Sequence, residues 1–494
     1  METDLNLGQK ILDSVNASRP EGISHLDVDT LPHPDGKDIF VLHKNLHYYI
    51  NGTKAQEILK KYGIPTDLLT DARKEGDTLD IGFETAEKIG LHLIPFLSYG
   101  VLNGGMATSY CDRKNNSAFN PELFAEAEKQ FEALSDTARN IPKGATPAYI
   151  NPDGTPGYDF MALKLRSILL NIKKSMAVTG KGPDAYRNSV FQMTSNSTDT
   201  ILRNKYRTYR ELPGIRELSE ETGVDITEVL GAVQPLIPAF THTSKGFPLD
   251  FFRKEDGSFY SLPGGHGQNF MVLRDTYRKL LAEGKKFVYL GNVDNIGFTV
   301  SPAEVAILAL SERNASFDFS FKTPVDVKGG ILVREKNGRL NCGDIGRAIS
   351  KEFVASHEAS GMPILFNCAT GLFNLEYLVE NLDRIIDSLP VRLIDQHKDI
   401  GMYSQTEQIT WEIIGLLESM IIFAVHKEER FIASKLLMDN ILASGLECCE
   451  TYLAKHEDTD FTRAVRATQK GLAWNLETQY GMKLSGGKWI PDNN

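Results

Sequence analysis

Residues 285–297 read KKFVYLGNVDNIG, and this stretch decides the fold class. Its first half is a short run rich in aromatic and β-branched residues, which is typical of a buried strand. Its second half, from Asn292 to Asn295, is polar and begins where the strand ends. Between residues 187 and 345 similar strand patterns alternate with helical ones, and this alternation predicts an α/β fold with a mostly parallel sheet.

Further elements can be placed on both sides of this stretch. The run IPFLSYGVL at 94–102 predicts a buried strand that leads into glycines. Asn120 and Pro121 suit the cap and first turn of a helix over 120–140, where apolar residues recur every three or four positions. Further helices are predicted over 159–176 and 269–283, and a hairpin turn at Asn337-Gly338.

The longest apolar stretch, residues 409–425, carries two glutamates. A membrane span needs about 20 apolar residues with few charges, so this stretch is interpreted as a buried helix. The pattern after about residue 400 is helical, including an amphipathic stretch over 436–456. We therefore predict three regions: a mixed and helical region over 1–95, a central domain over 96–400 and a helical C-terminal region over 401–494.

The composition limits the classes of partner. The 494 residues carry a formal net charge of −11, so the whole surface does not attract nucleic acid or an anionic membrane. The five cysteines include no CxxC pair, which argues against a disulfide framework or a structural zinc site. The first ten residues are polar and lack an apolar signal segment. We expect a cytoplasmic protein without a membrane partner, of unknown oligomeric state.

Two glycine-rich segments are candidates for phosphate binding. Asn103-Gly104-Gly105 follows a predicted strand, and the sequence Gly264-Gly265-His266-Gly267 precedes a predicted helix. Glycines allow close backbone approach, and free N–H groups at a helix start attract anions. Neither segment is a dinucleotide or P-loop motif, and a plain turn or an exposed loop remains the alternative reading.

Two polar segments could supply charge. Asp294 follows a predicted strand, and ligands in open α/β sheets bind at the carboxyl ends of strands. A carboxylate there can hold Mg²⁺ beside a triphosphate, although an Asx turn is the alternative. Lys435 ends the basic segment Arg430-Phe431-Ile432-Ala433-Ser434-Lys435, for which a solvated helix end is the alternative.

Taken together, these segments resemble one family, the UDP-sugar pyrophosphorylases, and within it the eukaryotic-type UTP–glucose-1-phosphate uridylyltransferases. The order of motifs carries the resemblance from about residue 97 to 440. The motifs are LNGG at 102–105, a segment containing Met193, Ser195, Thr198 and Asp199, GGHG at 264–267, NVDNIG at 292–297, DVKGG at 326–330, Phe366-Asn367, and RFIASK at 430–435.

The resemblance implies a fold and a reaction. The fold would be a nucleotide-binding mixed sheet of the glycosyltransferase-A type. The reaction would join UTP to a sugar 1-phosphate, expected to be glucose 1-phosphate, and release pyrophosphate. Relatives often end in a β-helix, but residues 436–494 lack its hexapeptide period, so we expect no β-helix here.

The resemblance also implies residue roles. Asn103, Gly104 and Gly105 would contact the nucleotide, Gly265 the uracil and His266 the α-phosphate. Asp294 would hold Mg²⁺, and Lys435 would reach the phosphates. The sugar would be contacted by Asn292, Gly330, Asp344 and Asn367.

The chain departs from the family pattern at several positions. After Thr108 the family continues to a lysine that binds the triphosphate, whereas Asn116 stands here by strict count. Lys114 is the candidate replacement, and Arg113 and Lys164 are the alternatives. Gln268 follows GHG where Asp is usual. His242 stands near where a uracil-reading Gln is expected, and Ala369 replaces a sugar-binding Asn.

These departures leave two other functions open. One is a non-catalytic relative that binds UTP or a UDP-sugar. The other is a glycosyltransferase that uses a UDP-sugar, which the absence of a D-x-D pair at Asp294 disfavours.

Overall fold

The computed structural model describes residues 3–19, 26–323 and 326–492, and its centre is a mixed sheet. The strand order is β2-β19-β13-β16-β12-β6-β7-β8. Neighbours are parallel, except that β16 runs antiparallel to both β12 and β13. The predicted α/β fold is confirmed. In chain order the strands are β2 (Ile39–Val41), β6 (Leu97–Leu102), β7 (Val190–Ser195), β8 (Leu230–Gln234), β12 (Phe287–Asn292), β13 (Ala315–Phe321), β16 (Leu365–Asn374) and β19 (Met420–Val425).

A hairpin extends this sheet beside β16. Its strands are β14 (Gly330–Glu335) and β15 (Leu340–Asp344), and β1 (Val28–Thr30) pairs with the other edge of β14. The predicted turn is confirmed, since Gly338 has φ +84° and its N–H donates to the carbonyl of Glu335. The register sets Gly330 directly opposite Asp344.

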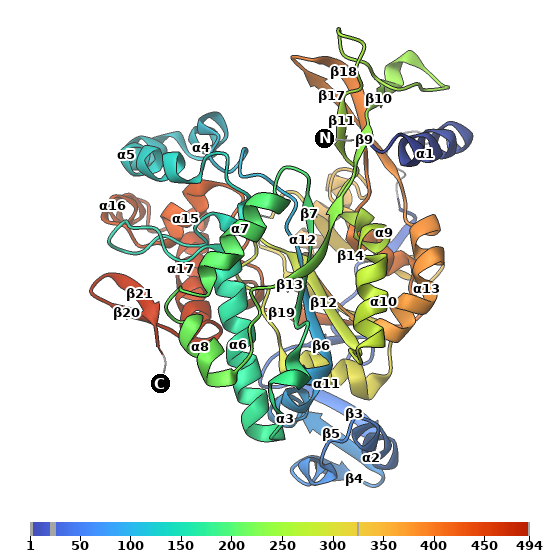
Figure 1. The fold of residues 1–494 in the computed structure, drawn as a ribbon, viewed down its shortest axis with the longest axis vertical. Helices are drawn as coiled ribbons and strands as arrows, with labels where there is room; N and C mark the ends of the chain where they lie inside the picture. Colours follow the sequence, from blue (N-terminus) through green and yellow to red (C-terminus); the bar gives the residue numbers. More distant parts are fainter. Residues whose placement is uncertain (1–2, 20–25, 324–325, 493–494) are drawn as a thin grey trace.

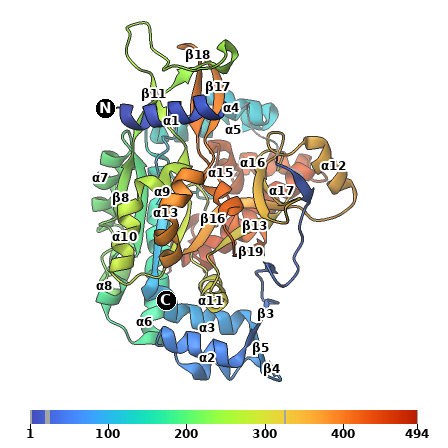
Figure 2. The ribbon, with the colours of Figure 1, turned by 90° about the vertical axis from the view of Figure 1, so that its right-hand side faces the viewer.

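Helices cover both faces of the sheet (Figures 1 and 2). On one face α3 (Phe83–Leu93), α6 (Phe160–Thr179) and α11 (Pro302–Ser311) share a core with β6 and β12. On the other face lie the shorter α9 (Asn269–Val272), α10 (Arg274–Ala282) and α13 (Leu375–Ser388). Because both faces are covered, the central strands are buried along almost their whole length, including the polar residues Ser316, Asp318 and Ser320 of β13.

A separate apolar core joins two helical segments that are far apart in the sequence. It packs α5 (Pro121–Ala138) and residues 107–111 against α15 (Leu437–Ala443), α16 (Glu447–Lys455) and two residues of α17 (Asp460–Thr478), and α4 (Arg113–Phe119) lies against α5. Asn120 caps α5 as predicted, by accepting from the N–H of Leu123. We call this group the helical module; it lies at one side of the sheet (Figure 1).

Smaller elements surround these layers. The remaining strands form small sheets: β3 (His47–Asn51) with β5 (Thr78–Gly82) and β4 (Arg73–Glu75), β9 (Leu236–Pro238) with β11 (Ser261–Pro263), β10 (Phe240–Thr241) with β18 (Gly401–Glu407) and β17 (Arg392–Lys398), and β20 (Met482–Ser485) with β21 (Lys488–Pro491). The remaining helices are α1 (Leu5–Ser18), α2 (Gly52–Lys61), α7 (Asp199–Tyr209), α8 (Arg216–Thr222), α12 (Lys351–Ala359) and α14 (Lys427–Arg430).

The prediction of one buried helix over 409–425 is wrong. Residues Thr410–Leu416 form a 3-10 helix, and Met420–Val425 is strand β19 within the central sheet. A strand buried on both faces is a continuous apolar run, so periodicity alone does not separate it from a buried helix. The predicted purely helical pattern after residue 400 is therefore also wrong, because β18, β19, β20 and β21 lie there.

Two predicted helices are each divided in two. The stretch 269–283 forms α9 and α10, with a break at Leu273, and the stretch 436–456 forms α15 and α16. Gly445, between the latter two, has φ +76°, a conformation that ends helices. The three-region division stays a prediction, although both terminal regions contribute a strand, β2 or β19, to the central sheet.

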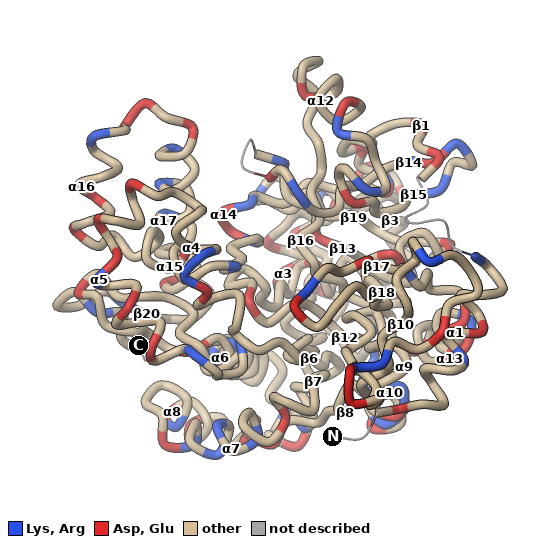
Figure 3. Tube along the Cα trace, turned by 90° about the horizontal axis from the view of Figure 1, so that it is seen from above, with Lys and Arg blue, Asp and Glu red and all other residues tan. Residues whose placement is uncertain are grey.

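The described part of the chain contains no helix long and apolar enough to cross a membrane. Lysine and arginine are interspersed with aspartate and glutamate over the outer helices (Figure 3).

Candidate active site

The glycine loop begins where β6 ends. Asn103 is fully buried beneath it and donates to Gln192 Oε1 (3.3 Å) and Tyr206 Oη (3.2 Å). Gly104 and Gly105, in contrast, line a cavity. Asn103 therefore anchors the loop from behind, and the two glycines are the part of it that faces the cavity.

This first cavity, the glycine-loop cavity, brings together candidates from three separate segments. It has a volume of about 350 Å³. Five of the predicted site residues line it: Gly104, Gly105, Gly265, His266 and Asn292. It lies at the carboxyl ends of parallel strands β6 and β12, where ligands of open α/β sheets bind.

The GGHG segment requires glycine for steric reasons. Gly265 has φ +91°, and an added Cβ would lie 2.5 Å from the carbonyl oxygen of Gln408. The next residue, His266, is held by the N–H of Thr410, which donates to its Nδ1 (3.2 Å). Burial lowers the pKa of His266 to about 4, helped by the nearby charge of Lys435. The ring is therefore neutral at pH 7, with its proton on Nε2, and it lines both this cavity and the next.

The NVDN segment and the RFIASK segment are tied to each other. Asn295 Oδ1 accepts from the N–H of Ile432 (2.9 Å), and its Nδ2 donates to the carbonyl of Arg430 (3.0 Å). The N–H of Ser434 donates to the carbonyl of Asp294 (3.1 Å). As a result Lys435 Nζ lies 3.0 Å from Asp294 Oδ2, so two residues 141 positions apart form an ion pair.

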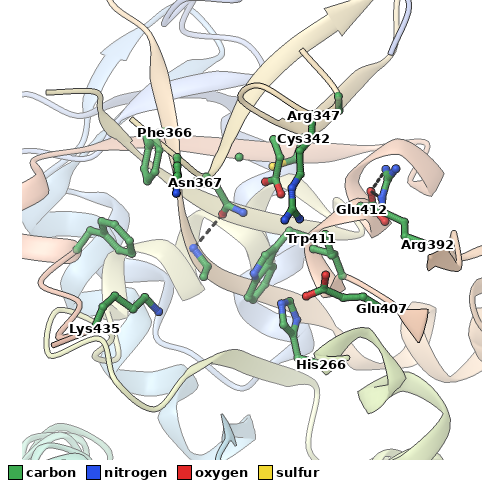
Figure 4. Close-up of a pocket in the computed structure, with 18 residues that line it drawn as sticks. His266, Cys342, Arg347, Phe366, Asn367, Arg392, Glu407, Trp411, Glu412 and Lys435 are labelled. Atoms are coloured by element: carbon green, nitrogen blue, oxygen red, sulfur yellow. Dashed lines mark hydrogen bonds and ion pairs between the residues drawn. The ribbon is translucent and has the colours of Figure 1, made fainter. Parts of the chain in front are cut away.

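A second cavity, the hairpin cavity, lies beside the β14–β15 hairpin and has a volume of about 260 Å³. Four more predicted site residues line it: Gly330, Asp344, Asn367 and Lys435. Figure 4 shows Lys435 at one end, a pair formed by Arg392 and Glu412 at the other, and Trp411 and His266 between them. The two cavities share His266 and Glu407 in their walls.

The hairpin cavity has charged groups that the sequence did not reveal. Arg392 Nε donates to Glu412 Oε1 (2.6 Å), while Glu412 Oε2 has no hydrogen-bond partner in the described structure. Burial raises the pKa of Glu412 and of Glu407 above the usual range. Arg347 extends into the cavity towards Trp411 (Figure 4).

The two lysines proposed for the triphosphate do not reach either cavity. Lys114 is exposed on α4 and is absent from both cavity walls. Lys164 is buried on α6 and donates to the carbonyls of Phe298 (2.8 Å) and Asn295. Burial lowers its pKa well below the usual range. Lys164 therefore holds the loop after β12 from behind.

Lys143 is a buried cation near the Asp294–Lys435 pair that the sequence analysis missed, although it too lines neither cavity. Its N–H donates to the carbonyl of Gly105 (2.9 Å), and its Nζ donates to the carbonyl of Ser434 (2.7 Å). Burial lowers its pKa to about 8, while Asp294 raises it and Lys435 lowers it. Lys143 thus lies beside the Asp294–Lys435 pair. A lysine between a proline and a glycine was the available signal.

The residue that could contact the uracil is also different from the one expected from the sequence. His242 directly follows strand β10, its Nδ1 is 2.7 Å from Ser244 Oγ, and it lines neither cavity. Gln234, at the carboxyl end of β8, lines the glycine-loop cavity. Its Nε2 donates to the carbonyl of Gly265 (2.7 Å) and to Gln268 Oε1 (2.9 Å), which leaves its own Oε1 available. Its position at a strand end was the signal.

No group of three or more His, Cys, Asp or Glu side chains suited to a metal ion occurs in the described ranges. Asp294 is a single carboxylate, with its side chain 16% exposed. Mg²⁺ commonly binds one or two carboxylates together with substrate phosphates and water, so a single carboxylate fits a metal that arrives with a nucleotide.

Comparison with known proteins gives the family. A curated UTP–glucose-1-phosphate uridylyltransferase from Hordeum vulgare is 25% identical over 253 residues, 50% of this chain and 51% of the relative. The enzyme of that name from Solanum tuberosum is 25% identical over 206 residues, 41% of each chain. The chain thus spans about half the length, or less, of these curated relatives.

The fold also matches solved structures. A variant of UDP-glucose pyrophosphorylase from Leishmania major, in complex with UDP-glucose, superimposes with a TM-score of 0.56 at 16% identity, covering 90% of this chain and 76% of that one. At this identity the likeness concerns the fold.

The model of one family, UTP–glucose-1-phosphate uridylyltransferase, matches residues 196–464. That range is more than half of the chain, and it contains the GGHG, NVDNIG, DVKGG and RFIASK motifs whose residues meet around the two cavities. The chain therefore belongs to the UTP–glucose-1-phosphate uridylyltransferase family.

Proposed function

We propose that this protein transfers the uridylyl group of UTP to a sugar 1-phosphate and releases pyrophosphate. The observation that carries the proposal is the arrangement of two cavities that share His266, with the Asp294–Lys435 pair beside them. A reaction between two phosphorylated substrates needs two such pockets in contact.

The glycine-loop cavity takes the nucleotide in this proposal. Gly104 and Gly265 let the backbone approach the uracil closely, and Gln234 supplies a free carbonyl oxygen for the uracil N–H. His266, neutral and protonated on Nε2, donates to the α-phosphate. Asn292 lies between the nucleotide and the sugar.

The hairpin cavity takes the sugar 1-phosphate. Asp344 and Asn367 offer acceptors and donors to sugar hydroxyls, and Gly330 leaves room for the ring, because an added Cβ there would lie 2.6 Å from Cys342 Sγ. Trp411 lines the same cavity and provides an apolar surface for the sugar. Lys435, at one end, faces the phosphate.

The chemistry needs positioning rather than proton transfer. An oxygen of the sugar 1-phosphate attacks the α-phosphorus of UTP, and the bond to the bridging oxygen breaks, so that pyrophosphate leaves with the electron pair. The attacking oxygen is already ionised at pH 7, and the main task is to hold two polyanions in line. Lys435 and Lys143 supply positive charge, with Lys143 taking the role first assigned to Lys114.

We further propose that Asp294 holds Mg²⁺ together with the triphosphate. The metal would neutralise phosphate charge. Lys435, the present partner of Asp294, is 65% exposed and can turn towards the substrate phosphate instead.

Glucose 1-phosphate is the proposed sugar substrate, supported by the names of the curated relatives. We place the protein in the cytoplasm, because all five cysteines are free and a reducing compartment suits them.

The test is to incubate the purified protein with UTP, Mg²⁺ and a panel of sugar 1-phosphates, and to follow pyrophosphate release. Release with glucose 1-phosphate supports the proposal in full, and release with another sugar corrects only the substrate. No release with any sugar, together with a higher melting temperature in UTP, would indicate a non-catalytic binding protein.

A further inference from the structure

A buried polar network joins the segment after the glycine loop to the segment that carries Lys435. Its centre is Asn440 on α15, a side chain only 2% exposed. Asn440 Nδ2 donates to Tyr110 Oη (2.8 Å) and to the carbonyl of Pro147 (3.1 Å). Its Oδ1 accepts from Ser434 Oγ (2.5 Å). Both ends of this amide are therefore fully used.

The network encloses Lys143. Its ammonium lies 3.4 Å from the centre of the Tyr110 ring and donates to the carbonyl of Ser434. A cation over an aromatic face is attracted by the ring, more strongly when water is excluded. Tyr110 and Ser434 thus define where the Lys143 ammonium lies.

A second set of bonds fixes Tyr110 itself. Asn116 is fully buried, donates through Nδ2 to the carbonyl of Tyr110 (2.9 Å) and accepts through Oδ1 from the N–H of Met438 (3.0 Å). The N–H of Leu437 also donates to the carbonyl of Tyr110 (3.0 Å). Asn116, which stands where the family pattern has a lysine, therefore joins α4 to α15.

The start of α15 is also anchored. Asp439 Oδ2 accepts from the N–H groups of Lys435 (2.9 Å) and Leu436 (2.8 Å). Lys435 consequently extends from a backbone that α15 holds, while α15 is held by Tyr110 and Asn116. Fully satisfied buried networks rigidify their surroundings, and sites lose activity when supporting residues allow shifts of about 1 Å.

We infer that Tyr110 and Asn440 are positioning residues that set the distance between Lys143 and Lys435. The helical module, whose α4 and α5 lie in the sequence between the glycine loop and Lys143 and whose α15 follows Lys435, then holds the two lysines at a fixed distance. The inference rests on the proposed function, since it assigns the two lysines to the substrate phosphates.

The experiment compares kcat, both KM values and the melting temperature for Asn440→Ala, Ser434→Ala and a control, Asn151→Ala. Asn151 is a buried amide that is likewise bonded at both ends: it donates to Thr155 Oγ1 and accepts from the N–H of Trp489, and it lines neither cavity. We expect Asn440→Ala to lower kcat about 10-fold or more. The control should lower the melting temperature without changing kcat.

Ser434→Ala keeps the protein intact if Asn440→Ala fails to fold, because it removes one hydroxyl and no backbone bond. We expect it to lower kcat several-fold and to lower the melting temperature less than Asn440→Ala does, because only one buried hydrogen bond is lost. Unchanged kcat in both the Ser434 and Asn440 variants, in a protein that Lys143→Ala inactivates, would overturn the inference and leave the proposed function standing. An inactive wild-type protein would instead remove the proposed function.

The pH profile tests the role of the Tyr110 ring. The charged or titratable groups acting on Lys143 are Asp294, Lys435, Asp439 and Cys111. Tyr110→Leu removes the ring attraction, so the basic limb of the kcat profile should move to lower pH, whereas Tyr110→Phe keeps the ring and the limb. Identical profiles for both variants would contradict the role of the ring.

Discussion

At the scale of single residues, Asp294 shows that the proposed site has few charged groups to act on the substrates. It lies between Asn292, in the wall of the glycine-loop cavity, and Lys435, in the wall of the hairpin cavity. Within the described structure no other carboxylates join it in a metal cluster. The activity proposed here therefore depends on one carboxylate and two lysines, each acting by charge and position.

Asp294→Ala should lower kcat by about 100-fold or more, because phosphoryl transfer depends on charge stabilisation. Its stability should stay close to wild type, since its partner Lys435 is 65% exposed and ion pairs open to solvent contribute about 0–1 kcal/mol. Pyrophosphate release and thermal unfolding measure the two effects. Asp71→Ala, which breaks an exposed pair with Lys88, is the matched control. Retained activity would show that the Mg²⁺ assignment is wrong.

Lys143→Ala should lower kcat by about 100-fold or more, whereas Lys114→Ala should leave it unchanged. The reason is placement: Lys143 lies beside Lys435, and Lys114 is exposed on α4. Burial lowers the pKa of Lys143 to about 8, so its charge is present below that pH and lost above it. The rate of the wild type should accordingly fall as pH rises through about 8. If Lys114→Ala lowers kcat and Lys143→Ala does not, Lys114 is the lysine that acts on the substrate phosphates.

At the scale of elements, the loop after β12 and the segment after α14 behave as one unit. Asn295 joins them through Arg430 and Ile432, and its Oδ1 also accepts from the N–H of Gly297 (3.0 Å). Lys164 supports the same loop from α6. The position of Lys435 relative to Asp294 is thus a property of these paired segments.

Asn295→Ala should reduce the free energy of unfolding by about 2–4 kcal/mol, because buried backbone groups lose their partner. It should also lower kcat, since the Asp294–Lys435 geometry depends on it. Denaturant unfolding and steady-state kinetics test both. The control Asn151→Ala should lose stability but keep its kcat. If Asn295→Ala also keeps its kcat, the geometry of the Asp294–Lys435 pair does not depend on Asn295.

At the scale of the whole molecule, a buried charge network joins four elements. Arg430 of α14 donates to Asp318 Oδ2 on β13 (2.8 Å), to Glu304 Oε1 on α11 (3.1 Å) and to Tyr289 Oη on β12 (2.6 Å). Two buried carboxylates share one guanidinium. Burial and the charge of Asp318 raise the pKa of Glu304 to about 8, so the folded protein retains a proton there at neutral pH.

This retained proton makes stability depend on pH. The unfolded chain loses the Glu304 proton at about 4.3 and the folded protein at about 8, so this contribution to stability is complete below about pH 4 and lost as pH rises towards 8. Glu304→Gln cannot titrate. The melting temperature of the wild type relative to Glu304→Gln should therefore fall between pH 5 and 8. A constant difference in melting temperature across that range would show that Glu304 does not retain this proton.

The sequence by itself determined the α/β class, the strands β6 and β12 and the turn between β14 and β15. Through the order of its motifs and the family resemblance it also indicated residues that meet at the two cavities, from Gly104 and His266 to Asp344 and Lys435. These features are local: strand and helix periods, glycine next to strand ends, and fixed spacing within motifs are read without knowing the packing.

Only the tertiary structure decided which lysine lies beside Lys435, because the helical module places Lys143 there and turns Lys114 outwards. It also buried Asn103 and Lys164, brought Gln234 to the cavity in place of His242, and made residues 420–425 a strand. The physical reason is common to these cases. A side chain's surroundings are set by segments far away in the sequence, and a fully buried apolar run forms a strand or a helix according to what packs on it.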